Sequence, residues 1–256
     1  MSDLVSAEFS NGVVTFTLRR PESRNALNRA LIAAIRGAFS EWSVREDITL
    51  GVLTGEGDKA FCAGGDLKEL MALRESGDAA DFAAQTRASL DEIRRFPVPV
   101  VAILNGDALG GGAELALACD MRVAAAHARI GFLQSSLNIN TSWGGGTDLF
   151  RIVRESQALY LLCSAELMDA RRAMEFGLLD MVAPPGEEGA EAIAAWIGRL
   201  AGRKPQVMRA IKSLARLRRS GAPESEWARV ETEEFARTWV HEDHWSAVAS
   251  MANRKK

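Results

Sequence analysis

Three consecutive glycines, Gly110 to Gly112, stand directly before Ala113 to Cys119, a run with the composition of a buried helix. Glycine has no side chain to separate its backbone from an approaching group. The first N–H groups of a helix lack partners within it and point outward at the positive end of the helix dipole. The stretch therefore suits an anion or a developing oxyanion, although a glycine-rich turn needed only for close packing has the same sequence.

Two further features accompany this triplet. Glu114 falls in the first turn of the predicted helix, where it is either part of a site at the glycines or only a favourable charge at a helix N-terminus. A second glycine-bearing loop, Ala60 to Leu67, ends where apolar residues begin to recur at helical spacing. The sequence thus predicts two glycine loops that each lead into a helix.

Alternating strands and helices are predicted to position these loops. Residues 4–9 and 13–18 flank Ser10-Asn11-Gly12 and predict a β-hairpin. A helix that Asn28 can cap follows the hairpin. We then predict a strand at 49–54, a helix at 81–96 and a strand at 99–104, followed by strand-like runs at 121–126 and 130–134. Such alternation is typical of an α/β fold with parallel crossovers.

From Thr147 onward the pattern is nearly all helical. Apolar faces of helical period cover residues 170–176, 189–200, 206–217 and 224–239. The basic segment Arg209 to Arg219 is interpreted as one solvated helix face. We expect a core over residues 1–195 and a helical C-terminal region over 196–256, whose apolar faces dock on other subunits.

Composition narrows the class of protein. The 256 residues are 47% hydrophobic and 25% charged, with a net charge of −3, which is typical of a soluble globular protein and argues against nucleic-acid binding. The three cysteines are widely spaced and favour neither a disulfide framework nor a zinc site. The three histidines lie far from the glycine loops in sequence, so a catalytic triad has little support. Neither a secretory leader nor a bilayer-length apolar run is apparent, and we expect a cytoplasmic protein that does not bind membranes.

Three motifs together resemble the enoyl-CoA hydratase/isomerase (crotonase) family: residues 23–28 (Ser-Arg-Asn-Ala-Leu-Asn), residues 60–67 (Ala-Phe-Cys-Ala-Gly-Gly-Asp-Leu) and residues 105–114 (Asn-Gly-Asp-Ala-Leu-Gly-Gly-Gly-Ala-Glu). They occur in the family's order, and the resemblance covers essentially the whole chain. It implies an α/β fold, a crotonase-like ββα spiral with a helical C-terminal trimerisation region, assembled as a trimer or a dimer of trimers. It also implies an acyl-CoA thioester substrate, with coenzyme A entering as part of the substrate and no separate cofactor or metal.

The resemblance assigns roles to individual residues. It implies that the backbone N–H groups of Gly65 and Gly111 stabilise a thioester enolate, which agrees with their predicted positions at helix starts. It further implies that a CoA groove is lined by Arg24, Ala26, Ala63, Asp66 and Leu67. A solvated loop charge is the alternative for Arg24, and a helix N-cap is the alternative or additional role for Asp66.

The catalytic side chains depart from the family pattern. Hydratases of this family use two glutamates; the first corresponds to Glu114, and the second, twenty residues later, corresponds to Gln134. A carboxamide can orient water but cannot accept its proton, so this replacement argues against simple hydration. Glu69, Glu75 or Asp148 is a conceivable substitute, but each is more simply a solvated helix charge.

The segment Ser142-Trp143-Gly144-Gly145 is similar to that of the ethylmalonyl-CoA and methylmalonyl-CoA decarboxylase branch. Loss of CO2 yields the same enolate without a base, Gln134 is a possible donor to the departing carboxylate, and Glu114 is a possible proton donor to the enolate carbon. Trp143 is either a pocket residue or a loop aromatic folded over the core. We therefore expect alkylmalonyl-CoA decarboxylation; the alternatives are a hydratase or isomerase that uses Glu114 alone and a non-catalytic acyl-CoA binder.

Overall fold

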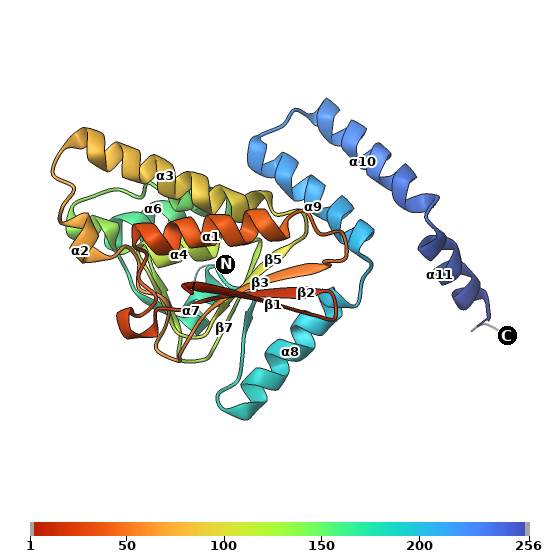
Figure 1. The fold of residues 1–256 in the computed structure, drawn as a ribbon, viewed down its shortest axis with the longest axis horizontal. Coiled ribbons are helices and arrows are strands. Elements are labelled where there is room, and N and C mark those ends of the chain that lie inside the picture. The colour runs from red at the N-terminus through yellow and green to blue at the C-terminus, as the bar shows by residue number, and fades with distance from the viewer. Residues whose placement is uncertain (1–2, 254–256) are drawn as a thin grey trace.

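The structure, a computed structural model, describes residues 3–253 (Figure 1). The chain begins with the predicted hairpin, in which β1 (Val5–Ser10) pairs antiparallel with β2 (Val13–Leu18). Asn11 and Gly12 at its turn both have positive φ, 50° and 80°. A two-residue hairpin turn of the favoured type requires this conformation, which Asn and Gly adopt most readily.

A six-stranded sheet forms the centre of the molecule. Its order is β1-β2-β3-β5-β7-β10, where β3 is Leu50–Gly55, β5 Val100–Leu104, β7 Met121–Ala124 and β10 Met181–Val182. All pairs after the hairpin are parallel, which confirms the predicted parallel crossovers. The central parallel strands β3, β5 and β7 are almost entirely buried, as expected where a sheet is covered on both faces.

A second, four-stranded sheet has the order β4-β6-β8-β9. Its strands are β4 (Ala60–Cys62), β6 (Asp107–Leu109), β8 (Arg129–Gly131) and β9 (Met168–Asp169). Each of β3, β5 and β7 in the large sheet is followed along the chain by a short strand of this second sheet. The result is the repeated ββα turn expected from the sequence, with both glycine loops following strands of the small sheet.

Several helical segments follow the hairpin, and the two longest of them run along the large sheet (Figure 1). These segments are the short 3-10 turn η1 (Pro21–Ser23), α1 (Arg29–Trp42), α2 (Leu67–Leu70), α3 (Ser76–Arg95) and α4 (Gly111–Ala118). Asn28 caps α1 as predicted, accepting from the N–H of Leu31 at 2.8 Å. Phe16 of β2 stacks on Phe39 of α1, and Phe96 meets the edges of both rings, so the aromatic core holds α1 and the end of α3 on the sheet.

Residues 130–134 are not one strand, contrary to the sequence prediction. Strand β8 ends at Gly131, and the 3-10 helix η2 (Leu133–Leu137) contains Gln134. Five residues are too few for the apolar pattern to separate a strand from a strand followed by a tight helical turn.

Helices make up most of the C-terminal half. They are α5 (Gly145–Ile152), α6 (Glu155–Ser164), α7 (Ala170–Glu175), α8 (Glu187–Ala201), α9 (Pro205–Ser220), α10 (Glu224–Trp239) and α11 (Glu242–Asn253). The predicted boundary at residue 195 lies inside α8, and the division into two regions stays a prediction. Across residues 3–253, no helix is long and apolar enough to span a membrane.

The basic segment of α9 is not one solvated face, so that interpretation was wrong. The side chain of Lys212 is only 1% exposed, and its Nζ lies 2.5 Å from Oδ2 of Asp120. Arg219 reaches the carbonyl oxygen of Cys119 at 3.0 Å. Helix α9 therefore docks on the end of α4 through buried positive charges, a role that charge spacing alone does not reveal.

Candidate active site

The two glycine loops lie against each other. Gly64 has a φ of +98°, and a Cβ on it would be 2.7 Å from the carbonyl oxygen of Leu109 and 3.3 Å from the nitrogen of Gly111. Only glycine permits both this conformation and this approach. In the part of the chain that the structure describes, neither the N–H of Gly65 nor that of Gly111 donates a hydrogen bond. The loops thus bring together two backbone donors that have no partner.

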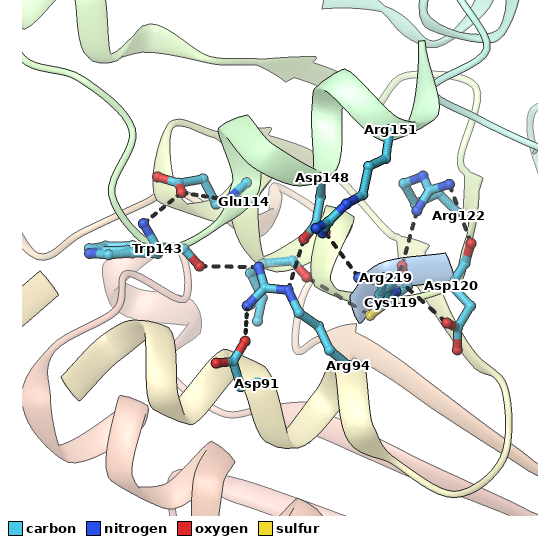
Figure 2. Close-up of polar contacts among 12 residues, drawn as sticks. Asp91, Arg94, Glu114, Cys119, Asp120, Arg122, Trp143, Asp148, Arg151 and Arg219 are labelled. Atoms are coloured by element: carbon cyan, nitrogen blue, oxygen red, sulfur yellow. Dashed lines mark hydrogen bonds and ion pairs between the residues drawn. The ribbon is translucent and has the colours of Figure 1, made fainter. Parts of the chain in front are cut away.

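Glu114 lies in the first turn of α4 and is buried, with 2% of its surface exposed. Its Oε2 accepts hydrogen bonds from the N–H groups of Trp143 and Gly145, each at 2.9 Å (Figure 2). Its Oε1 accepts from Nε2 of Gln134 at 2.9 Å. Burial raises the pKa of the Glu114 carboxyl above its ordinary value, and these hydrogen bonds offset part of that rise. A carboxyl group in this environment can serve as an acid or a base.

Gln134 turns its amide nitrogen toward Glu114. A carboxylate only accepts hydrogen bonds, so the NH2 group must face it. The carbonyl oxygen Oε1 is buried and has no hydrogen-bond partner among residues 3–253. An unpaired buried acceptor is costly and marks a place where a donor such as a substrate hydroxyl or water can bind.

Trp143 places its indole against both glycine loops. A Cβ on Gly65 would be 3.3 Å from Cη2 of the ring, and a Cβ on Gly111 would be 2.0 Å from Cζ3. The ring also meets Phe82 of α3 edge to face, with centroids 6.0 Å apart. The sequence left two alternatives for Trp143, a pocket residue or a loop aromatic folded over the core. In the structure its indole lies beside the two N–H groups and also packs on the core.

A buried ion-pair cluster supports the loop that carries Trp143 (Figure 2). Nη2 of Arg94, near the end of α3, donates to the carbonyl oxygen of Trp143 at 3.1 Å, and its Nε lies 2.8 Å from Oδ2 of Asp148. Asp148 was interpreted as a solvated helix charge, which was wrong: its side chain is 3% exposed and also pairs with Arg151 and Arg219. Arg94 was missed because a basic residue in the last turn of a helix is ordinarily a solvated, dipole-favoured charge.

Of the other two candidate carboxylates, Glu69 lies on α2 and Glu75 directly precedes α3. Glu69 accepts from the backbone N–H of Arg29 at 2.8 Å, and Glu75 is exposed immediately before α3. No hydrogen bond or ion pair of the described residues joins either group to Glu114. Of the four candidate acid–base groups, Glu114 is therefore the one beside the glycine triplet at the start of α4.

The residues assigned to the CoA groove come together beside the second glycine loop. The N–H of Ala63 donates to the carbonyl oxygen of Arg24 at 3.0 Å, and Leu27 forms a parallel bridge with Gly65. Ala26 lies between these contacts and accepts from Nη1 of Arg20 at 2.5 Å. Arg24 is exposed, with φ of 51°.

Asp66 and Leu67 complete this segment. Asp66 is the N-cap of α2, accepting from the N–H of Lys68 at 3.2 Å, and it forms an ion pair with Arg20 at 3.1 Å. The expected capping role of Asp66 is thus confirmed. Leu67 follows with 62% of its surface exposed, an apolar side chain available to a ligand.

A spiral of ββα turns that holds two unpaired backbone donors beside one buried carboxyl group is the architecture of an α/β enzyme suited to proton transfer next to a developing oxyanion. The family model described as enoyl-CoA hydratase/isomerase matches residues 8–256, and the chain belongs to this family. The predicted resemblance is confirmed at the level of the family.

Individual relatives and structures agree with this assignment. YngF of Bacillus subtilis, whose name describes an enoyl-CoA hydratase/isomerase, is 38% identical over 187 residues, which cover 70% of this chain and 71% of that protein. Human mitochondrial methylglutaconyl-CoA hydratase is 36% identical over 182 residues; the match covers 71% of this chain and about half (53%) of the human protein. The crystal structure of an enoyl-CoA hydratase/carnithine racemase from Magnetospirillum magneticum superposes with a TM-score of 0.91 at 28% identity, covering 99% of this chain and 94% of that one. The crotonase-like fold is thereby confirmed.

Proposed function

We propose that the chain is a hydratase-type lyase that adds water to a 2-enoyl-CoA thioester. The observation that carries this proposal is the pair of unpaired N–H groups of Gly65 and Gly111 next to the buried carboxyl group of Glu114. Two preorganised donors of this kind stabilise the oxyanion of a thioester enolate, each by about 3 kcal/mol. The names of the relatives reported above also favour hydration over decarboxylation.

In this mechanism one carboxyl group carries out both proton transfers. The Glu114 carboxylate takes a proton from water while the oxygen of that water bonds to C3 of the enoyl group. The electron pair moves to the thioester oxygen, where the two N–H groups stabilise the resulting enolate. The protonated Glu114 then returns the proton to C2, which leaves the carboxylate ready for the next cycle. Oε1 of Gln134, a buried acceptor that no described residue contacts by a hydrogen bond, orients the water.

The same group also suits isomerisation. A carboxylate that removes a proton from C2 of a 3-enoyl-CoA and returns it to C4 moves the double bond without a second carboxyl group. Isomerisation needs no bound water, so the presence of the acceptor Oε1 of Gln134, which can orient a water, favours hydration over isomerisation.

Decarboxylation of an alkylmalonyl-CoA is a second candidate, and the neutral side chain of Gln134 favours it. A substrate carboxylate entering the pocket meets one carboxyl group there instead of two. When CO2 leaves, the electron pair of the broken bond forms the same enolate, and protonated Glu114 delivers a proton to C2. The raised pKa of Glu114 suits such an acid. Trp143, packed on Gly65 and Gly111, then bounds the substituent on C2.

A turnover panel separates these activities. Crotonyl-CoA, a 3-enoyl-CoA, methylmalonyl-CoA and ethylmalonyl-CoA are each offered to the protein, and hydration, double-bond migration and CO2 release are measured. We expect hydration of crotonyl-CoA to be the fastest reaction. Faster CO2 release from either malonyl ester overturns this ranking, and tight CoA-ester binding without turnover identifies a non-catalytic binder.

The proposed CoA groove consists of Arg24, Ala26, Ala63, Asp66 and Leu67. The exposed guanidinium of Arg24 and the exposed side chain of Leu67 support it, because one suits a phosphate and the other an apolar part of the cofactor chain. The carboxylate of Asp66 is already paired with Arg20. We therefore assign to Asp66 the support of the groove rather than direct binding.

The C-terminal helices support a proposal of self-assembly. Helices α10 and α11 extend away from the core and contain no buried residue (Figure 1). Several large apolar side chains on them are exposed, namely Phe235, Trp239, Trp245 and Met251. Apolar surface of this kind marks a protein interface, and we propose a homotrimer or a dimer of trimers. We expect Trp245→Glu combined with Met251→Glu to reduce the mass measured by light scattering, whereas a monomeric wild type would contradict the proposal.

A further inference from the structure

A cavity of about 540 Å³ lies between α3, α5, α9 and α10. It shares the ion-pair cluster of Arg94, Asp148, Arg151 and Arg219 with the support of the Trp143 loop, but Gly65, Gly111, Glu114, Gln134 and the residues assigned to the CoA groove do not line it. Six arginines line it: Arg87, Arg94 and Arg95 from α3, Arg151 from α5, and Arg216 and Arg219 from α9. The acidic residues in its wall are Asp91 and Asp148. The cavity therefore has an excess of positive charge contributed by three separate helices.

The acidic groups are already engaged. Asp148 pairs with Arg94, Arg151 and Arg219 at 2.8, 3.3 and 3.2 Å (Figure 2). Asp91 pairs with Arg94 at 2.8 Å and, more weakly, with Arg95 at 4.0 Å. No carboxylate in the wall remains for the other two arginines.

Arg87 and Arg216 are those two. Over residues 3–253, neither side chain makes a hydrogen bond or an ion pair with another group. They belong to α3 and α9, two of the helices that line the cavity, and Arg94, a residue that is 9% exposed, lines it as well. Like charges held together at such a surface repel each other, and a bound anion relieves that repulsion.

We propose that this cavity binds a small, multiply charged anion with phosphate or polycarboxylate groups. Arg87 and Arg216 hold it through charge-assisted hydrogen bonds, because the planar guanidinium matches both phosphate and carboxylate oxygens. The remaining four arginines supply a positive field while staying in their ion pairs. The site is distinct from the proposed CoA groove, since the cavity that contains Arg24 is lined by Lys59, His127 and Arg129 and shares no residue with this one.

Calorimetric titration of the 256-residue chain at low ionic strength tests this site. Pyrophosphate and citrate are the two probes, so their relative affinity distinguishes phosphate from polycarboxylate chemistry. We expect saturable binding of at least one of them, weakened tenfold or more in Arg87→Gln, Arg216→Gln and the double variant. Arg171→Gln is the matched control, because Arg171 is an exposed arginine on α7 outside this cavity. The affinity of this variant for the two probes should equal that of the wild type.

Four results would overturn the proposal. They are no binding of either probe by the wild type, equal affinity in the double variant, an equal loss in the Arg171→Gln control, and loss of binding in Arg24→Gln instead, which would put the anion in the CoA groove. Circular dichroism and the melting temperature show whether each variant is folded. If Arg87→Gln/Arg216→Gln changes the mass of the assembly and the wild type binds no probe, the cavity is a contact between copies of the chain.

Discussion

The indole of Trp143 lies so close to Gly111 that a Cβ on this glycine would be 2.0 Å from Cζ3 of the ring. The same ring covers Gly65, so one side chain bounds both proposed oxyanion donors. Any side chain at position 111 would displace the indole. The glycine is therefore required by the indole as well as by the substrate oxygen that it is proposed to bind.

This contact determines how the Gly111 donor is tested. Proline is tolerated in the first turn of a helix, so replacing Gly111 by proline removes the N–H without breaking the helix. It also introduces a Cβ that meets Trp143, and this clash must be separated from the loss of the N–H. The comparison is therefore made in a Trp143→Gly background, where Gly111→Ala retains the N–H and Gly111→Pro removes it. We expect the proline variant to turn over about 10²- to 10³-fold more slowly than the alanine variant. Equal rates in two folded proteins would remove Gly111 from the oxyanion site.

Glu114→Gln tests the proton-transferring group. The substitution is nearly isosteric and keeps an oxygen that can accept from the N–H groups of Trp143 and Gly145, which now donate to Oε2 at 2.9 Å, but the group can no longer take up or release a proton. We expect kcat to fall by roughly 10²- to 10⁴-fold, with the dissociation constant of a CoA ester nearly unchanged. Asp148→Asn is not a suitable comparison because it breaks a buried cluster. The control is Glu69→Gln, at a carboxyl group on α2 that forms no ion pair with any of residues 3–253 and accepts from the N–H of Arg29. A wild-type rate in Glu114→Gln would exclude the group from the reaction.

The pH dependence of turnover shows in which form Glu114 acts. Burial raises the pKa of this carboxyl, so its protonated form persists to higher pH than that of an ordinary glutamate. Hydration begins with the carboxylate, and kcat/KM should therefore fall as the pH falls through the raised pKa. Decarboxylation uses the carboxylic acid, so its rate should fall as the pH rises through the same value. The measurement is the pH dependence of the rate on the substrate that the panel selects, and the sign of the slope distinguishes the two reactions. The Glu114→Gln variant should lack this pH dependence.

The buried pair of Lys212 and Asp120 predicts an asymmetric loss of stability. Asp120→Asn leaves the 1% exposed ammonium of Lys212 without its partner, and removal of one member of a buried pair costs about 3 to 5 kcal/mol. Lys212→Met should cost less, because Asp120 still accepts from the N–H of Val100 at 2.8 Å. Urea unfolding at fixed protein concentration measures both. Asp243→Asn at the exposed pair with Lys204 is the control and should change the free energy of unfolding by no more than about 1 kcal/mol.

The glycine loops that lead into helices could be predicted from local backbone chemistry. The correspondence of Glu114 and Gln134 to the two glutamates of the family was implied by the resemblance, and the two side chains do meet, at 2.9 Å. Arg94 and Lys212 could not be found this way, because their burial depends on which distant helices pack against α3 and α9. Strand β6, with three residues, is also too short for an apolar period to identify.

The contact between Gln134 and Glu114 allows the reaction itself to be tested by Gln134→Glu. The new carboxyl group would lie against Glu114, and two carboxyl groups in contact share a proton, which raises the pKa of one of them. For a hydratase this supplies a second acid and base, and we expect crotonyl-CoA hydration to rise tenfold or more. For a decarboxylase the added negative charge repels the substrate carboxylate in a buried pocket and slows CO2 release. Gln134→Met, which keeps the size but removes the acceptor Oε1, is the matched control and should lower hydration about tenfold if that oxygen orients the water. A fall in CO2 release with no gain in hydration would identify the decarboxylase instead.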